Sequence, residues 1–73
     1  MERLGTMQRI AQGLPIVRVA DPPAVGTTVV DDQLHDVGTV VDVFGPVDSP
    51  YATVAPVEST QLTPLIGQPL YVR

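Results

Sequence analysis

The sequence contains no cysteine, which excludes disulfide bonds, thiolate zinc sites and cysteine nucleophiles. It also contains no lysine, and its four arginines are outnumbered by eight acidic residues, so the net charge is −4. No run of basic side chains is present along the chain. Direct electrostatic binding of nucleic-acid phosphates is therefore not expected, because that interaction needs several basic side chains on one face.

A chain of 73 residues supports one domain, 1–73, and a domain of this size buries only roughly 60% of the surface of its unfolded form. A deep catalytic pocket would remove much of that small core. No apolar run reaches the roughly 20 residues of a membrane span, and no signal peptide is recognisable. We therefore expect a cytoplasmic protein without a membrane partner.

The acidic excess combined with the absence of lysine suggests adaptation to high salt, where carboxylate-rich surfaces stay soluble. The alternative is chance in a short gene of biased base composition. The response of stability to salt distinguishes the two.

Valine and threonine dominate the composition, with thirteen and seven copies, and such β-branched residues favour strands over helices. Eight prolines and six glycines are scattered along the chain and leave no stretch long enough for an average helix. The composition therefore predicts an all-β protein, and several short strands at close spacing predict a closed barrel or a sandwich.

Turn residues divide the chain into short β-branched runs. We expect strands over residues 5–12, 14–19, 25–30, 37–44, 51–55 and 67–72. Gly13 lies between the first two, and Gly45-Pro46 follows the fourth, so each pair predicts a hairpin. Asp21-Pro22-Pro23 interrupts pairing, one helical turn is possible near 61–65, and Pro69 predicts that the last strand lies at a sheet edge.

The run from Val37 to Val47 is apolar on both pleat faces. Strict alternation places Thr39, Val41 and Val43 on one face and Val40 and Phe44 on the other. A small barrel buries only one of these faces in its own core. We therefore expect a protein partner to cover the other face.

Residues that carry chemistry are few. His35 lies near Asp31, Asp32 and Asp36, a set that suits a metal ion or proton transfer, but without a recurring ligand spacing a solvated turn is favoured. Ser49 and Ser59 lack a nucleophile-elbow context, and no glycine pattern precedes a helix to hold a phosphate. We expect no enzyme activity, no metal, no cofactor and no small-molecule substrate.

The aromatic residues are Phe44, Tyr51 and Tyr71. Exposed rings on a small barrel commonly stack bases, but they then need interleaved arginine or lysine. Packing in or on the core is the favoured interpretation. A contact with a protein is the better alternative, because aromatic anchors are enriched at protein interfaces.

Several segments of the sequence carry a resemblance to a known family: Val37-Gly38-Thr39-Val40-Val41, Asp42-Val43-Phe44-Gly45-Pro46-Val47-Asp48-Ser49-Pro50-Tyr51, the earlier Pro22-Pro23-Ala24-Val25-Gly26-Thr27 followed by Val29-Val30-Asp31, and the closing Gly67-Gln68-Pro69-Leu70-Tyr71-Val72. Together these segments resemble archaeal Gar proteins of the H/ACA ribonucleoprotein. The resemblance implies a six-stranded closed β-barrel of the translation-factor and reductase type. It also implies a non-catalytic subunit that docks on the TruB-like, dyskerin-type pseudouridine synthase.

In that family role the subunit biases a mobile loop of the synthase, assists the placement and turnover of substrate RNA, and reaches the H/ACA guide RNA only indirectly. The resemblance assigns the partner-binding residues to the segment around the glycine-proline corner: Val43, Phe44, Gly45, Pro46, Val47, Pro50 and Tyr51. The alternative for the same residues is structural, with a hairpin turn at Gly45-Pro46 and rings that fill the core.

Two other functions stay open. One is a stand-alone small barrel that binds a ligand or nucleic acid, which a basic groove would support. The other is a related Naf-type H/ACA assembly factor, which normally carries long flanking extensions. An uncharged apolar patch beside Gly45-Pro46 would favour the synthase-binding subunit. The arginine-glycine-rich tails of eukaryotic members are absent from this sequence.

Overall fold

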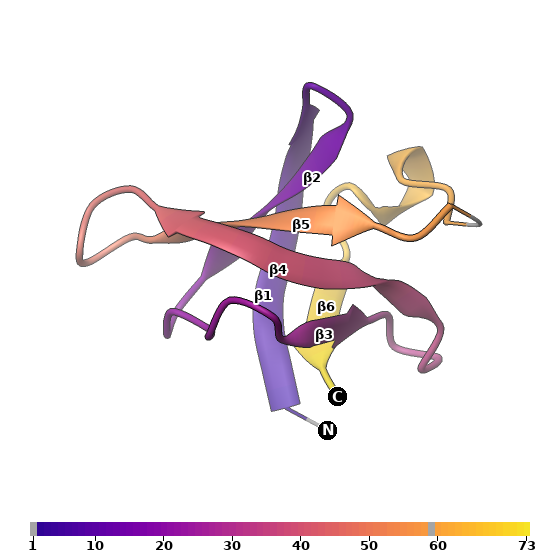
Figure 1. The fold of residues 1–73 in the computed structure, drawn as a ribbon, viewed down its shortest axis with the longest axis horizontal. Coiled ribbons are helices and arrows are strands. Elements are labelled where there is room, and N and C mark those ends of the chain that lie inside the picture. Colours follow the sequence, from indigo (N-terminus) through magenta and orange to yellow (C-terminus); the bar gives the residue numbers. More distant parts are fainter. Residues whose placement is uncertain (1, 59) are drawn as a thin grey trace.

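Six antiparallel strands close into a barrel in the computed structural model, which describes residues 2–58 and 60–73 (Figure 1). The elements are β1 (Glu2–Ala11), β2 (Leu14–Val19), β3 (Thr28–Val30), β4 (Asp36–Phe44), β5 (Tyr51–Pro56), the short 3-10 helix η1 (Thr63–Leu65) and β6 (Pro69–Val72). Around the barrel the strands follow the order β1-β2-β5-β4-β3-β6. The predicted all-β fold and six-stranded closed barrel are confirmed.

Two of the hairpins follow the sequence signals. Gln12 and Gly13 connect β1 to β2 with positive φ angles of 54° and 79°, the conformation that a two-residue type I′ turn requires. The β4–β5 hairpin turns through residues 45–50, as the glycine and prolines there predict. β1 begins before the expected Gly5, because Glu2 and Arg3 pair with β6.

The third strand is shorter than predicted. The run 25–30 looks like one strand, but only Thr28–Val30 pairs regularly. Gly26 adopts a φ of 96°, and its N–H donates to the carbonyl oxygen of Val40 at 2.8 Å. This turn leaves Val25 exposed beside β4.

The expectation that the last strand lies at an edge is wrong. β6 pairs with both β1 and β3 and so closes the barrel, and Leu70 is fully buried. Pro69 is tolerated because it is the first residue of the strand, where a missing N–H is least costly. Gly67 and Gln68, just before it, form backbone hydrogen bonds with Met7.

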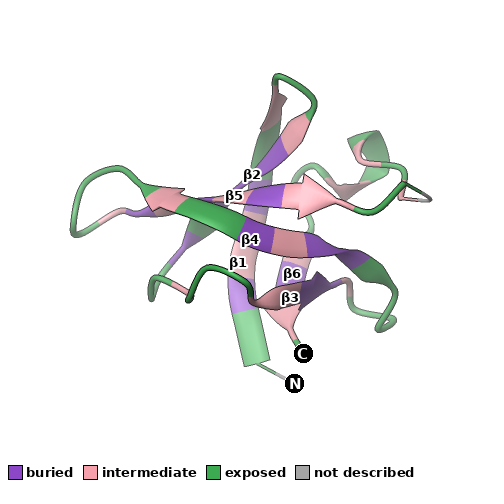
Figure 2. Ribbon diagram, viewed as in Figure 1, coloured by how far each residue is buried: buried purple, intermediate pink, exposed green. Residues whose placement is uncertain are grey.

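The core fills the barrel with aliphatic side chains from every strand, shown as the purple segments in Figure 2. The core cluster consists of Leu4, Met7, Val17, Val19, Val29, Val37, Val40, Ala52, Val54 and Leu70. Among the described residues no polar or charged side chain is buried. Packing of this one cluster is therefore the main source of stability.

A β-bulge in β4 decides which of its side chains face outward. Val40 pairs with Val54 and Asp42 pairs with Thr53. Val41 is therefore the extra residue of the bulge and has no partner on β5. Val40 is buried, Val41 is 46% exposed, and Val43 packs against the core cluster. The alternation predicted from the sequence, with Val41 and Val43 on one face, is therefore wrong beyond Val40.

Candidate protein-binding site

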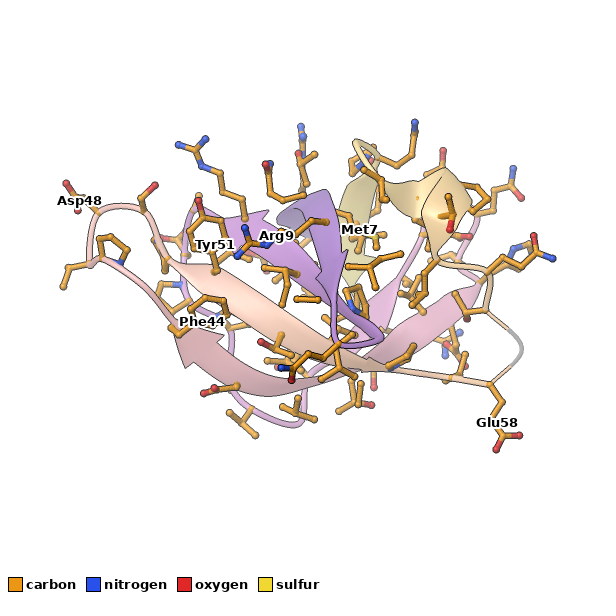
Figure 3. The ribbon with its side chains drawn as sticks, turned by 90° about the horizontal axis from the view of Figure 1, so that it is seen from above. Met7, Arg9, Phe44, Asp48, Tyr51 and Glu58 are labelled. Atoms are coloured by element: carbon orange, nitrogen blue, oxygen red, sulfur yellow. The ribbon has the colours of Figure 1, made fainter. Side chains whose placement is uncertain are left out.

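The β4–β5 hairpin projects from the barrel and ends in a compact turn. The N–H of Ser49 donates to the carbonyl oxygen of Pro46 at 3.1 Å, which places Val47 and Asp48 at the corner. Figure 3 shows Asp48 at one extreme of the molecule, beyond Phe44 and Tyr51. Val47 is 99% exposed, an unusual position for a branched aliphatic side chain.

Two aromatic rings form the base of this loop. Phe44 and Tyr51 are cross-strand partners, and their rings stack with centroids 5.7 Å apart. Phe44 is 40% exposed, whereas Tyr51 is half-buried. Gly45 follows with a φ of 97°, and a Cβ at this position would lie 3.1 Å from Cδ2 of Tyr51. The backbone conformation therefore favours glycine, and a Cβ here would also crowd the ring beside it.

Exposed apolar side chains concentrate on β4 and its loop. Val41, Phe44 and Val47, which we call the apolar strip, are all exposed within residues 41–47. Val25, 67% exposed, lies next to the Gly26–Val40 hydrogen bond and so borders the same strand. Single exposed apolar residues are ordinary, but several on one segment are typical of an interaction surface.

The structure sorts the seven predicted partner-binding residues into two groups. Phe44, Gly45, Pro46 and Val47 are exposed, and Tyr51 supports them from its half-buried position. Val43 turns toward the core, and Pro50 is buried, with its carbonyl oxygen accepting a hydrogen bond from the N–H of Val19 at 3.1 Å. These two residues hold the hairpin in place and offer little surface to a partner.

Val41 and Val25 are exposed residues that sequence reasoning did not assign to the site. Val41 is exposed only because of the bulge, and Val25 only because the strand starts late. Amino-acid composition predicts neither the bulge at Val41 nor the late start of β3, although Gly26 indicates a turn.

The acidic turn around His35 has a structural explanation. One carboxylate oxygen of Asp31 accepts hydrogen bonds from the N–H groups of Gln33 and His35, both at 2.9 Å, and so holds the turn closed. The other oxygen lies 3.5 Å from Nδ1 of His35. Within residues 2–58 and 60–73 no group of three or more potential ligand side chains could hold a metal ion.

Ser49 is the one serine that the structure describes. Ser49 lies in the β4–β5 loop, where Nη2 of Arg18 donates to its Oγ at 3.5 Å, and Ser59 lies outside the described residues. In the part of the chain that the structure covers, no helix has the length and apolar character needed to cross a membrane.

The fold defines a class of protein: small, closed β-barrel domains of six antiparallel strands. The model of one family, the Gar1/Naf1 RNA binding region, matches residues 1–73, and the chain therefore belongs to the Gar1/Naf1 family. Members of this family are accessory proteins of H/ACA particles.

A solved structure described as the Gar1 domain of Naf1 has the same fold. It superposes with a TM-score of 0.80 and 16% sequence identity, over 97% of this chain and 79% of that one. At this identity the similarity concerns the fold alone. No curated protein sequence matches the chain.

Proposed function

We propose that this protein is an archaeal, non-catalytic subunit of the H/ACA RNA-guided rRNA pseudouridylation complex in the cytoplasm. It docks on the TruB-like, dyskerin-type pseudouridine synthase and assists the placement and turnover of substrate RNA. The observation that carries the proposal is the exposed, preformed apolar hairpin around Val47 in a chain of the Gar1/Naf1 family.

The hairpin suits docking because it is ordered before binding. The Pro46–Ser49 bond closes the tip of the loop, and the bond from the N–H of Val19 to the carbonyl oxygen of Pro50 fixes its C-terminal end. Two prolines further restrict its backbone, so the loop loses little conformational entropy when a partner covers it. The docked hairpin would thus keep most of the free energy of burial.

The apolar strip supplies that free energy. Burial of a fully exposed valine such as Val47 is worth about 1.5 kcal/mol or somewhat more, and a partly exposed Phe44 adds further apolar area. Aromatic anchors near the centre of an interface commonly dominate its affinity. The proposed subunit therefore acts by binding, and it biases a mobile loop of the synthase that handles substrate RNA.

The test replaces Val47 by aspartate and measures association with an archaeal TruB-like synthase by calorimetry. Val47→Asp is expected to raise the Kd at least tenfold, because it buries a charge in an apolar contact. It should also lower pseudouridine formation by the complete guide-RNA particle to the rate measured without the subunit.

The matched control is Val57→Asp, the same change near Glu58, which Figure 3 places at the opposite end of the molecule. This variant is expected to bind normally. Normal binding by Val47→Asp, or equal loss in both variants, would refute the assignment of the interface to the hairpin.

The matching family model covers Naf1 as well as Gar1, which favours a second candidate, a Naf-type assembly factor. The two roles differ in how long the protein stays bound to the synthase. A subunit stays bound to the synthase after the guide RNA has loaded, whereas an assembly factor leaves. Sedimentation of the loaded particle with labelled protein distinguishes them.

A further inference from the structure

The arginines are not distributed evenly over this acidic protein. Residues 2–19, which form β1 and β2, contain three arginines and one carboxylate, whereas the remaining residues contain one arginine and seven carboxylates. A scan for consecutive basic residues misses this, because the hairpin brings together residues that are far apart in sequence. The β1–β2 hairpin is thus locally positive in a protein of net charge −4.

Two of these arginines line one open groove. The groove has a volume of about 660 Å³ and lies between the outer side of β1–β2 and the β4–β5 loop. Its polar side chains are Arg3, Thr6, Gln8, Arg18, Asp48 and Ser49. We call it the β1–β2 groove.

Backbone pairing and side-chain bonds connect the two arginines. Thr6 and Arg18 are cross-strand partners, and Nη2 of Arg3 donates to Oγ1 of Thr6 at 3.1 Å. On the other side of the groove, Oγ of Ser49 accepts a hydrogen bond from Nη2 of Arg18 at 3.5 Å. Arg3, Thr6 and Arg18 therefore form a row of hydrogen-bond donors along one wall of the groove. The hydroxyl groups of Thr6 and Ser49 can also donate a hydrogen bond to an anion.

These guanidinium groups are not neutralised within the described residues. There the ion pairs are Arg73 with Asp36, at 3.0 Å, and His35 with Asp31. Arg3 and Arg18 are exposed and make no such pair in residues 2–58 and 60–73. In a chain with twice as many acids as arginines, two unpaired guanidinium groups in one groove point to an external anion.

We propose that the β1–β2 groove binds the sugar-phosphate backbone of single-stranded RNA through Arg3 and Arg18. The guanidinium fork matches phosphate oxygens, and the open groove admits an extended chain. Tyr51 is the cross-strand partner of Arg18, so its ring lies next to that arginine, but it stacks on Phe44 and does not line the groove. The description of the family as an RNA binding region agrees with this choice of ligand but does not locate it.

The proposal goes beyond the docking function, since it assigns direct RNA contact to residues outside the apolar strip. The groove and the strip meet at the β4–β5 loop, where Ser49 and Asp48 line the groove while Val47 is exposed at the corner. The carboxylate of Asp48 lines the same groove and would repel a bound anion. The binding is therefore expected to be weak, and Asp48→Asn is expected to strengthen it.

The test uses the full chain alone and fluorescence anisotropy of a labelled decauridine. Two phosphate contacts predict that log K falls with log salt with a slope of about −1.4, since each contact on a single strand contributes about −0.7. Arg3→Gln and Arg18→Gln are each expected to weaken binding severalfold and to reduce the slope to about −0.7. Asp48→Asn is expected to strengthen binding at least twofold.

Arg73→Gln is the matched control, because it removes the same charge outside the groove. It should change the affinity less than twofold. An equal loss in Arg73→Gln would overturn the proposal, as would equal binding of polyglutamate of the same length or binding of inorganic phosphate without binding of the oligonucleotide. The synthase is absent, so failure here leaves the docking proposal untouched.

Discussion

Phe44 and Tyr51 stack across the β4–β5 hairpin, with ring centroids 5.7 Å apart and ring planes inclined by 22°. The pair is the last one of the β4–β5 ladder before the loop, and Tyr51 also pairs with Arg18 of β2. One ring is exposed and the other is half-buried. The same contact therefore stiffens the hairpin and offers an apolar surface.

A double-mutant cycle on this pair should show direct coupling. Phe44→Ala and Tyr51→Ala are each expected to lower the free energy of unfolding, and their coupling energy should be about 0.5–1.5 kcal/mol, the usual value for an aromatic pair. Urea unfolding of the four proteins measures it. A coupling energy near zero would show that the rings do not stack in solution.

Gly45→Ala should destabilise the protein by about 1–3 kcal/mol, because alanine is strained at a φ of 97°. Gly26→Ala is the matched control, with a φ of 96° and open space around the added Cβ. Gly45→Ala should be the more harmful of the two, since its Cβ also crowds Tyr51. Equal losses of stability would contradict that ring contact. Bulky variants at Gly45 are consequently poor probes of binding.

Leu70→Ala tests the closure of the barrel by β6. Leu70 is fully buried, and its truncation should cost about 2–5 kcal/mol. Val25→Ala, at an exposed position, should change stability by less than about 0.5 kcal/mol. Thermal unfolding followed by circular dichroism compares them. A mild effect of Leu70→Ala would support the edge position that the sequence predicts.

Salt should stabilise the protein if its surface is adapted to a saline cell. The exposed carboxylates repel one another at a net charge of −4, and salt screens that repulsion. The urea midpoint is expected to rise between low and molar KCl. The double variant Asp32→Asn, Glu58→Gln should show a smaller rise. A midpoint that falls with KCl would refute the adaptation.

Strand composition and turn residues predicted most of this fold. The runs 14–19, 37–44 and 51–55 contain β-branched residues and are each bordered on at least one side by glycine or proline, and all three are strands. The position of β6 was not predictable in this way, because its neighbours β1 and β3 lie far from it in sequence. Strand composition says nothing about such distant partners.

The candidate site was predictable in part. The glycine and prolines of 45–50 indicate an ordered loop, and Val47 and Phe44 are exposed there. The bulge at Val41 reverses the facing of the residues that follow, and single-sequence alternation cannot locate it. The meeting of Arg3 and Arg18 depends on the register of β1 with β2, including a second irregularity between Met7 and Arg9. The groove therefore becomes visible only in three dimensions.

The pairing of β1 with β6 joins the first and last strands, which lie side by side in Figure 1. A ribosome must therefore release residues up to Val72 before Glu2 and Arg3 find their partners. Until then β1 and β3 each lack a neighbour, and the aliphatic interior is open on one side. Contacts between such distant residues slow folding, so closure of the barrel is expected to be a late step of folding.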